Sequence, residues 1–255
     1  MCNADAAENA YIGGLKPKYS KFPARCWRYE MRHAVVTGAS SGIGEAIVKR
    51  LLAEGWQVTG LSRRPVTLET PSFTSLSVDI SKPDALMAVL QPLPPPHAVI
   101  HAAGMMAAAP LGLLESATGD ALWRLHVQAC EVLFNHFAPR MASGGRLVAI
   151  GSRTSRGAAG RSQYVATKAA MVGMIRSWAA ELAPRGITAN VVAPGATQTP
   201  MLSSPGREPS PPKCPPLGRL IRPEEVAGLV NFLLSEEAAA ITGQEIAICG
   251  GASLS

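Results

Sequence analysis

The chain has 255 residues, of which 47% are hydrophobic and 16% charged, a composition typical of one globular domain with a substantial core. The formal net charge is +6, but the basic residues are scattered and do not alternate with aromatic side chains, which disfavours nucleic-acid binding. Five widely spaced cysteines without a CxxC pair disfavour a disulfide framework and a zinc site, so we expect no metal and a cytoplasmic protein, and no apolar run is long enough to predict a membrane span.

Residues 1–30 differ from the rest of the chain because they show no periodic apolar segment and contain several glycines, prolines and lysines. They also lack the apolar core of a secretory signal. We predict a flexible N-terminal extension over residues 1–30, with a membrane-binding or partner-binding arm as the alternative. A single compact domain is expected over residues 31–255.

The compact part opens with a pattern typical of a mononucleotide-binding unit. Residues 33–37 predict a short buried strand, a glycine-rich turn follows at 38–44, and apolar residues at helical spacing come next. Gly38 would allow the tight turn, and Gly42 and Gly44 would let the backbone approach a pyrophosphate at the helix N-terminus. A purely structural turn is the less favoured alternative.

The second predicted strand, 56–61, ends in Ser62, Arg63 and Arg64. An acidic residue at this point would hold the adenosine ribose hydroxyl of NAD, whereas a guanidinium suits the 2′-phosphate of NADP and binds it through paired hydrogen bonds. The two arginines therefore favour NADP(H) over NAD(H), unless they are simply solvated loop residues.

The rest of the compact part alternates between strands and helices, although residues 65–73 show little helical pattern. We expect strands at 75–79, 97–101, 146–150, 187–193 and 244–249, and helices at 84–90, 119–139 and 224–234, with a further helix running through Tyr164 and Leu182. The proline-rich segment 194–218 is predicted to be a loop, which we interpret as a lid over the substrate rather than a disordered insert.

Three residues of the second half suggest proton-transfer chemistry. Tyr164 and Lys168 are four apart on one face of a predicted helix, and a nearby ammonium draws a phenol's pKa down towards the working range. Ser152 follows the carboxyl end of a predicted parallel strand, where such sheets bind ligands, and could donate to a substrate oxygen. The spacing of Tyr164 and Lys168 alone is also compatible with a surface helix pair.

Taken together, these motifs resemble the short-chain dehydrogenase/reductase family over residues 33–253. The matching residues are Thr37 to Gly44, Asp79, Gly104, Ser152, Tyr164, Lys168, Asn190, Pro194, Gly195 and Thr199. The resemblance implies a single α/β domain of the Rossmann-type doubly wound class with a seven-stranded parallel sheet, assembled as a homotetramer or homodimer. It also implies reversible hydride transfer between NAD(P) and an alcohol or carbonyl.

The resemblance further implies roles for individual residues. Tyr164 is similar to the family's general acid/base, Ser152 to the residue that polarises the carbonyl, and Lys168 to the lysine that holds the nicotinamide ribose and lowers the tyrosine pKa. The expected cofactor contacts are Thr37, Gly38, Ser40, Ser41, Gly42, Ile43, Gly44, Ser62, Arg63, Arg64, Asp79, Ile80, Ala103, Gly104, Tyr164, Lys168, Pro194, Gly195, Thr197 and Thr199. Asp79 would touch the adenine or cap the helix that begins near Ser81.

Two positions depart from the family pattern. The family's Asn-Asn-Ala-Gly is His101-Ala102-Ala103-Gly104 here, and His126 stands where the long central helix usually carries an asparagine that holds a water beside the lysine. His126 is a candidate catalytic residue that would bond a water or substrate, or titrate near neutrality; alternatively it simply packs against its neighbours.

The predicted function is NADP(H)-dependent hydride transfer to or from a small-molecule carbonyl or secondary alcohol, with a 3-oxoacyl thioester or a small ketone as candidate substrates. The alternative is a catalytically weak NADP(H)-binding sensor or scaffold, which His126 and Ala102 favour. Arg153, Arg156 and Arg161 would meet an anionic group of the substrate or face solvent. No nucleic-acid or membrane partner is expected.

Overall fold

The computed structural model describes residues 31–203 and 213–254. The predicted extension over residues 1–30 lies outside the described residues, and so does the part of the proline-rich segment from 204 to 212.

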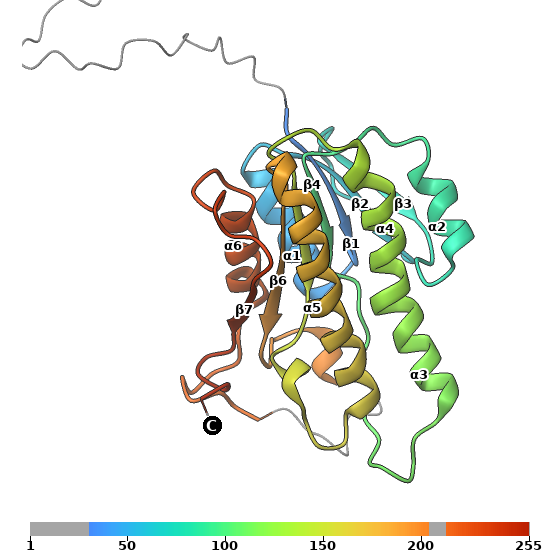
Figure 1. Ribbon diagram of the computed structural model, residues 1–255, viewed down its shortest axis with the longest axis vertical. Helices are drawn as coiled ribbons and strands as arrows, with labels where there is room; N and C mark the ends of the chain where they lie inside the picture. The colour runs from blue at the N-terminus through green and yellow to red at the C-terminus, as the bar shows by residue number, and fades with distance from the viewer. Residues whose placement is uncertain (1–30, 204–212, 255) are drawn as a thin grey trace, which may run out of the picture. The chain divides into compact units, whose positions relative to one another are not determined.

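The described chain forms one seven-stranded sheet in which every paired strand is parallel (Figure 1). The strand order is β3-β2-β1-β4-β5-β6-β7. The strands are β1 (His33–Thr37), β2 (Gln57–Ser62), β3 (Phe73–Ser77), β4 (Ala98–His101), β5 (Arg146–Ile150), β6 (Thr188–Pro194) and β7 (Glu245–Ile248). The predicted fold class, a doubly wound Rossmann-type domain, is confirmed. The order reverses between β1 and β4, and such a switch point opens a crevice at the carboxyl ends of the strands.

Helices cover both faces of the sheet because successive side chains of each strand point to opposite sides. Ala34 and Val36 of β1 belong to one apolar core, under α1 (Gly42–Ala53) and α6 (Pro223–Leu233). Val35 belongs to the other, under α2 (Pro83–Leu90), α4 (Ala129–Phe137) and α5 (Ser162–Leu182). Figure 1 shows α4 and α5 in front of the sheet. Fully buried strands explain the continuous apolar runs that the sequence shows.

Two expected elements differ from the observed ones. The third strand runs from Phe73 to Ser77 rather than over 75–79, because Phe73 pairs with Val58 and its ring packs against Gly60. Asp79 therefore lies two residues beyond the strand.

The long helix expected at 119–139 begins earlier and is interrupted. It consists of α3 (Ser116–Trp123), a π-helical turn η1 (Arg124–Gln128), α4, and the short η2 (Ala138–Arg140). The π turn contains His126, and π turns inside α-helices are frequent at functional sites.

Three further short turns, η3 (Arg153–Arg156), η4 (Ala183–Arg185) and η5 (Pro200–Ser203), complete the described elements. Nowhere in the described residues is there a helix both long and apolar enough to cross a lipid bilayer.

Candidate active site

A cavity of about 810 Å³ opens at the carboxyl ends of the central strands, and we call it the main cavity. Its walls are the glycine-rich turn after β1, the segment after β4, the segment from Gly151 to Thr154 after β5, and the segment that follows β6. Crevices of this size at the switch point of a parallel sheet are the usual ligand sites of the fold.

The glycine-rich turn packs so tightly that side chains are excluded from two of its positions. A Cβ at Gly44 would lie 2.2 Å from the carbonyl oxygen of Gly38, and a Cβ at Gly38 would lie 2.8 Å from the backbone of Ala103. Gly38 and Gly42 also have positive φ angles, which glycine adopts without strain. Ser41, at the N-cap of α1, makes no side-chain capping bond, so the first turn of this helix presents backbone N–H groups towards the main cavity.

Thr37 lies beneath this turn rather than in the cavity wall, since its side chain is fully buried. Its hydroxyl oxygen accepts hydrogen bonds from the backbone N–H groups of Ala102 and Ala103, both at 3.1 Å, and contacts Nδ1 of His101 at 3.0 Å. Because the Thr37 oxygen already accepts two hydrogen bonds, its hydroxyl proton is donated to Nδ1 of His101. Nδ1 is therefore the acceptor, and the proton of the neutral ring is on Nε2. Thr37 thus ties the end of β1 to the end of β4.

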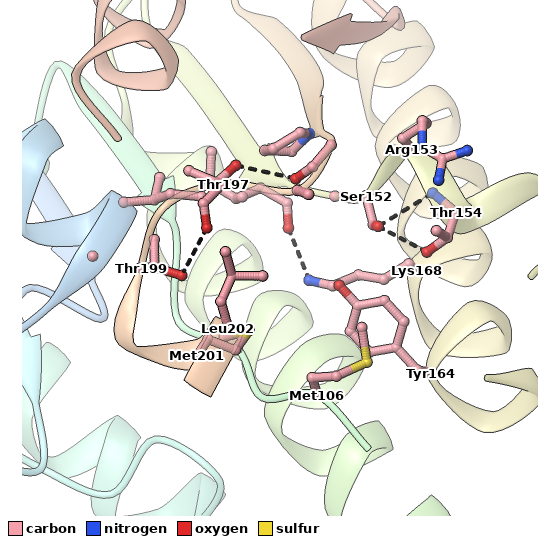
Figure 2. Close-up of a pocket in the computed structure, with 18 of the residues that line it drawn as sticks. Met106, Ser152, Arg153, Thr154, Tyr164, Lys168, Thr197, Thr199, Met201 and Leu202 are labelled. Atoms are coloured by element: carbon pink, nitrogen blue, oxygen red, sulfur yellow. Dashed lines mark hydrogen bonds between the residues drawn. The ribbon is translucent and has the colours of Figure 1, made fainter. Parts of the chain in front are cut away.

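Tyr164 and Lys168 lie one turn apart on α5 and are both buried, with 7% and 4% of their surfaces exposed. The ammonium of Lys168 is 5.9 Å from the centre of the Tyr164 ring and donates to the carbonyl oxygen of Ile150 at 2.8 Å. Burial lowers the pKa of Lys168 to about 8. Figure 2 shows Ser152, Tyr164 and Lys168 on one side of the main cavity and Thr197 and Thr199 on the other.

Ser152 is positioned by a tight turn at the end of β5. Its hydroxyl oxygen accepts the N–H of Thr154 at 3.2 Å and contacts the hydroxyl of Thr154 at 2.9 Å. Thr154 was not expected at the site, although a serine hydroxyl commonly bonds the backbone two residues further along the chain. The Ser152 hydroxyl keeps one proton that it can donate either to Thr154 or to a ligand.

His126 is fully buried in the π turn, and the protein uses both of its ring nitrogens. Nε2 accepts the N–H of Met105 at 3.0 Å, and Nδ1 pairs with the hydroxyl of Thr167 at 2.9 Å. Because that hydroxyl donates its own proton to the carbonyl oxygen of Tyr164, Nδ1 must be the donor and the ring is neutral. Its ring meets that of Tyr164 edge to face at 5.6 Å.

These contacts support the packing interpretation of His126. Burial, with the charge of Lys168 as a smaller contribution, holds the pKa of His126 well below its ordinary value, so the expectation that it titrates near neutrality is wrong. With both nitrogens bonded to protein, neither is available to a water or a substrate, and His126 does not line the main cavity. Thr167, three residues after Tyr164 on the same helical face, is a partner that its spacing could have indicated.

The predicted cofactor residues fall into two groups. Those that line the main cavity are Gly38, Ser41, Gly42, Ile43, Gly44, Ala103, Gly104, Tyr164, Lys168, Pro194, Gly195, Thr197 and Thr199. Those that do not line it are Thr37, Ser40, Ser62, Arg63, Arg64, Asp79 and Ile80. Apart from Thr37 and Ser40, the residues of the second group lie at the end of β2 or shortly after β2 and β3.

Asp79 is occupied by local contacts. Its Oδ1 accepts the N–H and the hydroxyl of Ser81, at 3.1 and 2.7 Å. The hydroxyl bond is the main reason why the pKa of Asp79 is lowered, and Arg63 and Lys82 add to it. The carboxylate therefore organises the turn before α2, but it does not cap the helix as the alternative expected, because the N-cap of α2 is Lys82 and no side chain makes a capping bond there.

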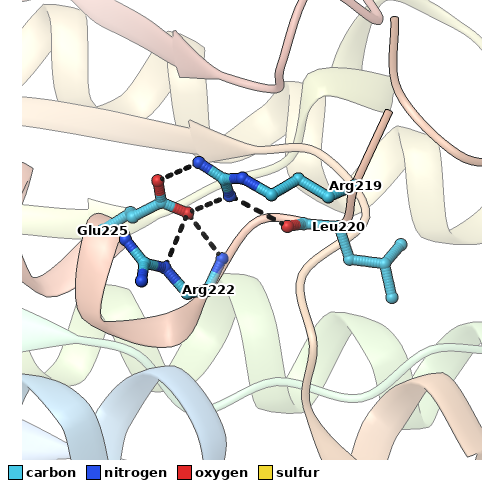
Figure 3. Close-up of polar contacts among 4 residues, drawn as sticks. All are labelled: Arg219, Leu220, Arg222 and Glu225. Atoms are coloured by element: carbon cyan, nitrogen blue, oxygen red, sulfur yellow. Dashed lines mark hydrogen bonds and ion pairs between the residues drawn. The ribbon is translucent and has the colours of Figure 1, made fainter. Parts of the chain in front are cut away.

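The proline-rich segment after β6 contributes to the main cavity on both sides of its undescribed part. Met201 and Leu202 of η5 give an apolar wall, and Lys213 and Pro216 line the cavity further along. The segment is attached to α6 by Arg219, which donates to both carboxylate oxygens of Glu225 at 2.7 and 2.8 Å (Figure 3).

The three arginines after Ser152, which are Arg153, Arg156 and Arg161, lie in different surroundings. Arg153 and Arg161 line the main cavity and are half-buried. Arg156 does not line it: its side chain is 86% exposed and lies 3.9 Å from the carboxylate of Glu245.

Comparison with known proteins places these features in context. A family model described as enoyl-(acyl carrier protein) reductase matches residues 38–253. A 3-oxoacyl-(acyl-carrier-protein) reductase, FabG, of Thermotoga maritima is 30% identical over 88% of this chain and 98% of its own length. Carbonyl reductase family member 4 of Xenopus laevis is 34% identical over 86% of this chain and 97% of its own length.

A solved structure agrees with the observed fold. A blue fluorescent protein from a metagenomic library, crystallised in complex with NADPH, is 29% identical and superposes with a TM-score of 0.76 over 87% of this chain and 97% of its own.

Proposed function

This chain belongs to the short-chain dehydrogenase/reductase family of oxidoreductases, and on that premise we propose that it transfers a hydride between NADP(H) and a carbonyl or secondary alcohol. The observation that carries the proposal is the convergence of Ser152, Tyr164 and Lys168 in one cavity that the glycine-rich turn also lines (Figure 2). A 3-oxoacyl thioester or a small ketone is the proposed substrate, in keeping with the names of the two relatives.

The residues of the main cavity fit a dinucleotide. Gly38 and Gly44 leave no room for side chains, so the backbone can approach a pyrophosphate, and the uncapped N-terminus of α1 would bind it. Arg63 and Arg64 would hold a 2′-phosphate, and the NADPH-bound neighbour supports that preference. The bound nicotinamide would supply the hydride.

The proposed mechanism assigns the remaining work to three side chains. In the reductive direction, Ser152 and Tyr164 donate hydrogen bonds to the substrate carbonyl and orient it. Tyr164 gives its proton to the carbonyl oxygen as the carbon accepts the hydride. Lys168, whose positive charge lies one turn away, stabilises the resulting phenolate and would hold the nicotinamide ribose.

We expect Tyr164→Phe to abolish turnover while NADPH binding stays largely unchanged, because the phenol oxygen is the proton donor whereas the phosphates bind elsewhere. The assay follows NADPH loss with a panel of carbonyl compounds and is repeated with NADH. Turnover that survives in Tyr164→Phe would refute the assignment, and a preference for NADH would refute the proposed role of Arg63 and Arg64.

A catalytically weak sensor or scaffold is the second candidate, and the bonds of His126 favour it. With both ring nitrogens engaged, His126 cannot hold a water beside Lys168, so proton resupply to Tyr164 would need another route. Tight NADPH binding without turnover on any carbonyl of the panel would favour this candidate.

A further inference from the structure

The charged residues in the wall of the main cavity all carry the same sign. They are Arg153, Arg161, Lys168 and Lys213, and no aspartate or glutamate of the described residues lines the cavity. Lys168 is accounted for by the proposed chemistry, and the phosphates of the cofactor would lie at the glycine-rich turn. The remaining cations come from the segments that flank Ser152 and Tyr164 and from the proline-rich segment.

Arg153 is the best placed of these cations. It directly follows Ser152, it is half-buried, and its Nη1 donates to the carbonyl oxygen of Ala252 at 3.0 Å, which holds the guanidinium in the cavity wall (Figure 2). No carboxylate of the described residues pairs with it. A guanidinium has five N–H donors, so one backbone carbonyl leaves most of them for a ligand.

Arg156, three residues after Arg153, differs from it in having an acidic partner. It lies outside the cavity beside Glu245, whose other carboxylate oxygen accepts the hydroxyl of Ser155 at 2.5 Å. The turn η3 thus turns one arginine towards an acidic partner and leaves the other in the wall of the main cavity. A guanidinium that lines a cavity and keeps donors beyond its one protein bond can bind an anionic ligand there.

We propose that the substrate of this enzyme carries an anionic group, a carboxylate or a phosphate, that Arg153 binds while Ser152 and Tyr164 hold the carbonyl. Arg161 and Lys213 also line the main cavity. In the reaction, the hydride goes to the carbonyl carbon, the proton of Tyr164 goes to its oxygen, and the anionic group is unchanged. The inference rests on the proposed function and narrows its substrate class.

The test compares charged substrates with neutral partners of the same skeleton. Pyruvate, acetoacetate and levulinate are each assayed against their amides, and dihydroxyacetone phosphate against dihydroxyacetone, with NADPH. For at least one pair, we expect the wild-type kcat/KM to favour the anion by about tenfold or more, because a charge-assisted bidentate bond is about twice as strong as a neutral one. The carboxylate and phosphate arms show which anion is bound.

Arg153→Met should lower that anion-to-neutral ratio by about tenfold, and Arg153→Lys should restore part of it, since lysine keeps the charge but not the paired geometry. Arg156→Met is the matched control and should keep the wild-type ratio. A wild-type ratio near one for every pair, or a ratio that Arg153→Met leaves unchanged, would overturn the proposal.

A second measurement separates this inference from the proposed function. If no carbonyl is reduced, the proposed hydride-transfer function is wrong. Calorimetry on the NADP⁺-bound protein still tests, independently of turnover, whether anions bind at Arg153. Tighter binding of the anions than of their neutral partners, lost in Arg153→Met and kept in Arg156→Met, supports the site. Equal binding of both members of each pair contradicts it.

Discussion

His126 is a buried, neutral side chain that joins two walls of the site. Through Met105 it holds the segment after β4, and through Thr167 it holds the helix turn that carries Tyr164. The family's asparagine at this place is expected to hold a water beside the lysine, whereas both ring nitrogens of His126 bind protein groups directly. We therefore regard His126 as a positioning residue.

The protonation of His126 makes a prediction about stability. Burial keeps it neutral in the folded protein, whereas the unfolded chain would protonate it below the ordinary pKa of 6.5. The unfolded state then binds more protons, so the free energy of unfolding falls as the pH drops through 6.5. His101, whose pKa burial lowers to about 3, adds to the same loss.

We expect His126→Asn to make this loss shallower by up to about 1.4 kcal/mol per pH unit between pH 6 and 5, which is the effect of one proton. Urea unfolding at several pH values measures the slope for wild type and variant. A slope that does not change in His126→Asn would show that His126 is protonated in the folded protein. The neutral ring that we assign from its hydrogen bonds would then be wrong.

At the scale of elements, the N-terminus of α6 is bound to Arg219, which directly follows the proline-rich segment that contributes to the wall of the main cavity. Glu225 accepts two bonds from Arg219 and one from the backbone N–H of Arg222 at 2.8 Å (Figure 3). The pKa of Glu225 is lowered from an ordinary value of 4.5 to about 2. The hydrogen bond from the Arg219 side chain is the largest cause, and the bond from the Arg222 backbone is the next.

Because the carboxyl pKa is lower in the folded protein than in the unfolded chain, the ionised Glu225 stabilises the fold at pH values above 4.5. This stabilisation is lost as the pH falls from 4.5 towards 2. We expect Glu225→Gln to lower the melting temperature at pH 7, and the difference from wild type to shrink over that acid range. Glu224→Gln, an exposed change one residue earlier, is the control. A difference that is the same at pH 7 and pH 3 would mean that the charge of Glu225 does not stabilise α6.

At the scale of the whole molecule, the outer face of α5 has the small side chains that allow two helices to approach closely. Ala166, Ala169 and Gly173 are exposed on it, and a Cβ at Gly173 would meet nothing within 4 Å in the single chain. Large apolar side chains are exposed on other helices too: Trp123 of α3 is 49% exposed, and Phe232 of α6, on the other face of the sheet, is 43% exposed. We propose that these surfaces are covered in a homodimer or homotetramer.

Light scattering should give twice or four times the chain mass of 26.7 kDa. Gly173→Arg should lower that mass without destabilising the monomer, because arginine has a higher helix propensity than glycine, by up to about 1 kcal/mol. Ala53→Arg, at the exposed end of α1, should leave the assembly intact. A wild-type mass of one chain, or a Gly173→Arg variant with the wild-type mass, would contradict assembly through α5.

Local patterns in the sequence were sufficient for the fold class and the succession of strands along the chain, and they singled out Ser152, Tyr164 and Lys168, which line one cavity in the structure. Strands buried on both faces leave continuous apolar runs, a strand-glycine-helix turn needs glycine at fixed places, and one helical turn brings Tyr164 to Lys168. The third strand was misplaced by two residues, since Phe73 is assigned by its contact with Gly60 on a neighbouring strand.

Only the tertiary structure decided the state of His126, the local role of Asp79, and the separate environments of Arg153 and Arg156. These features depend on local turn geometry or on partners that are distant along the chain. The distant partners are Met105 and Thr167 for His126, Ala252 for Arg153, and Glu245 for Arg156. Periodicity records which face of an element is buried, but the hydrogen-bond partner of a polar side chain is set by distant segments that folding brings together.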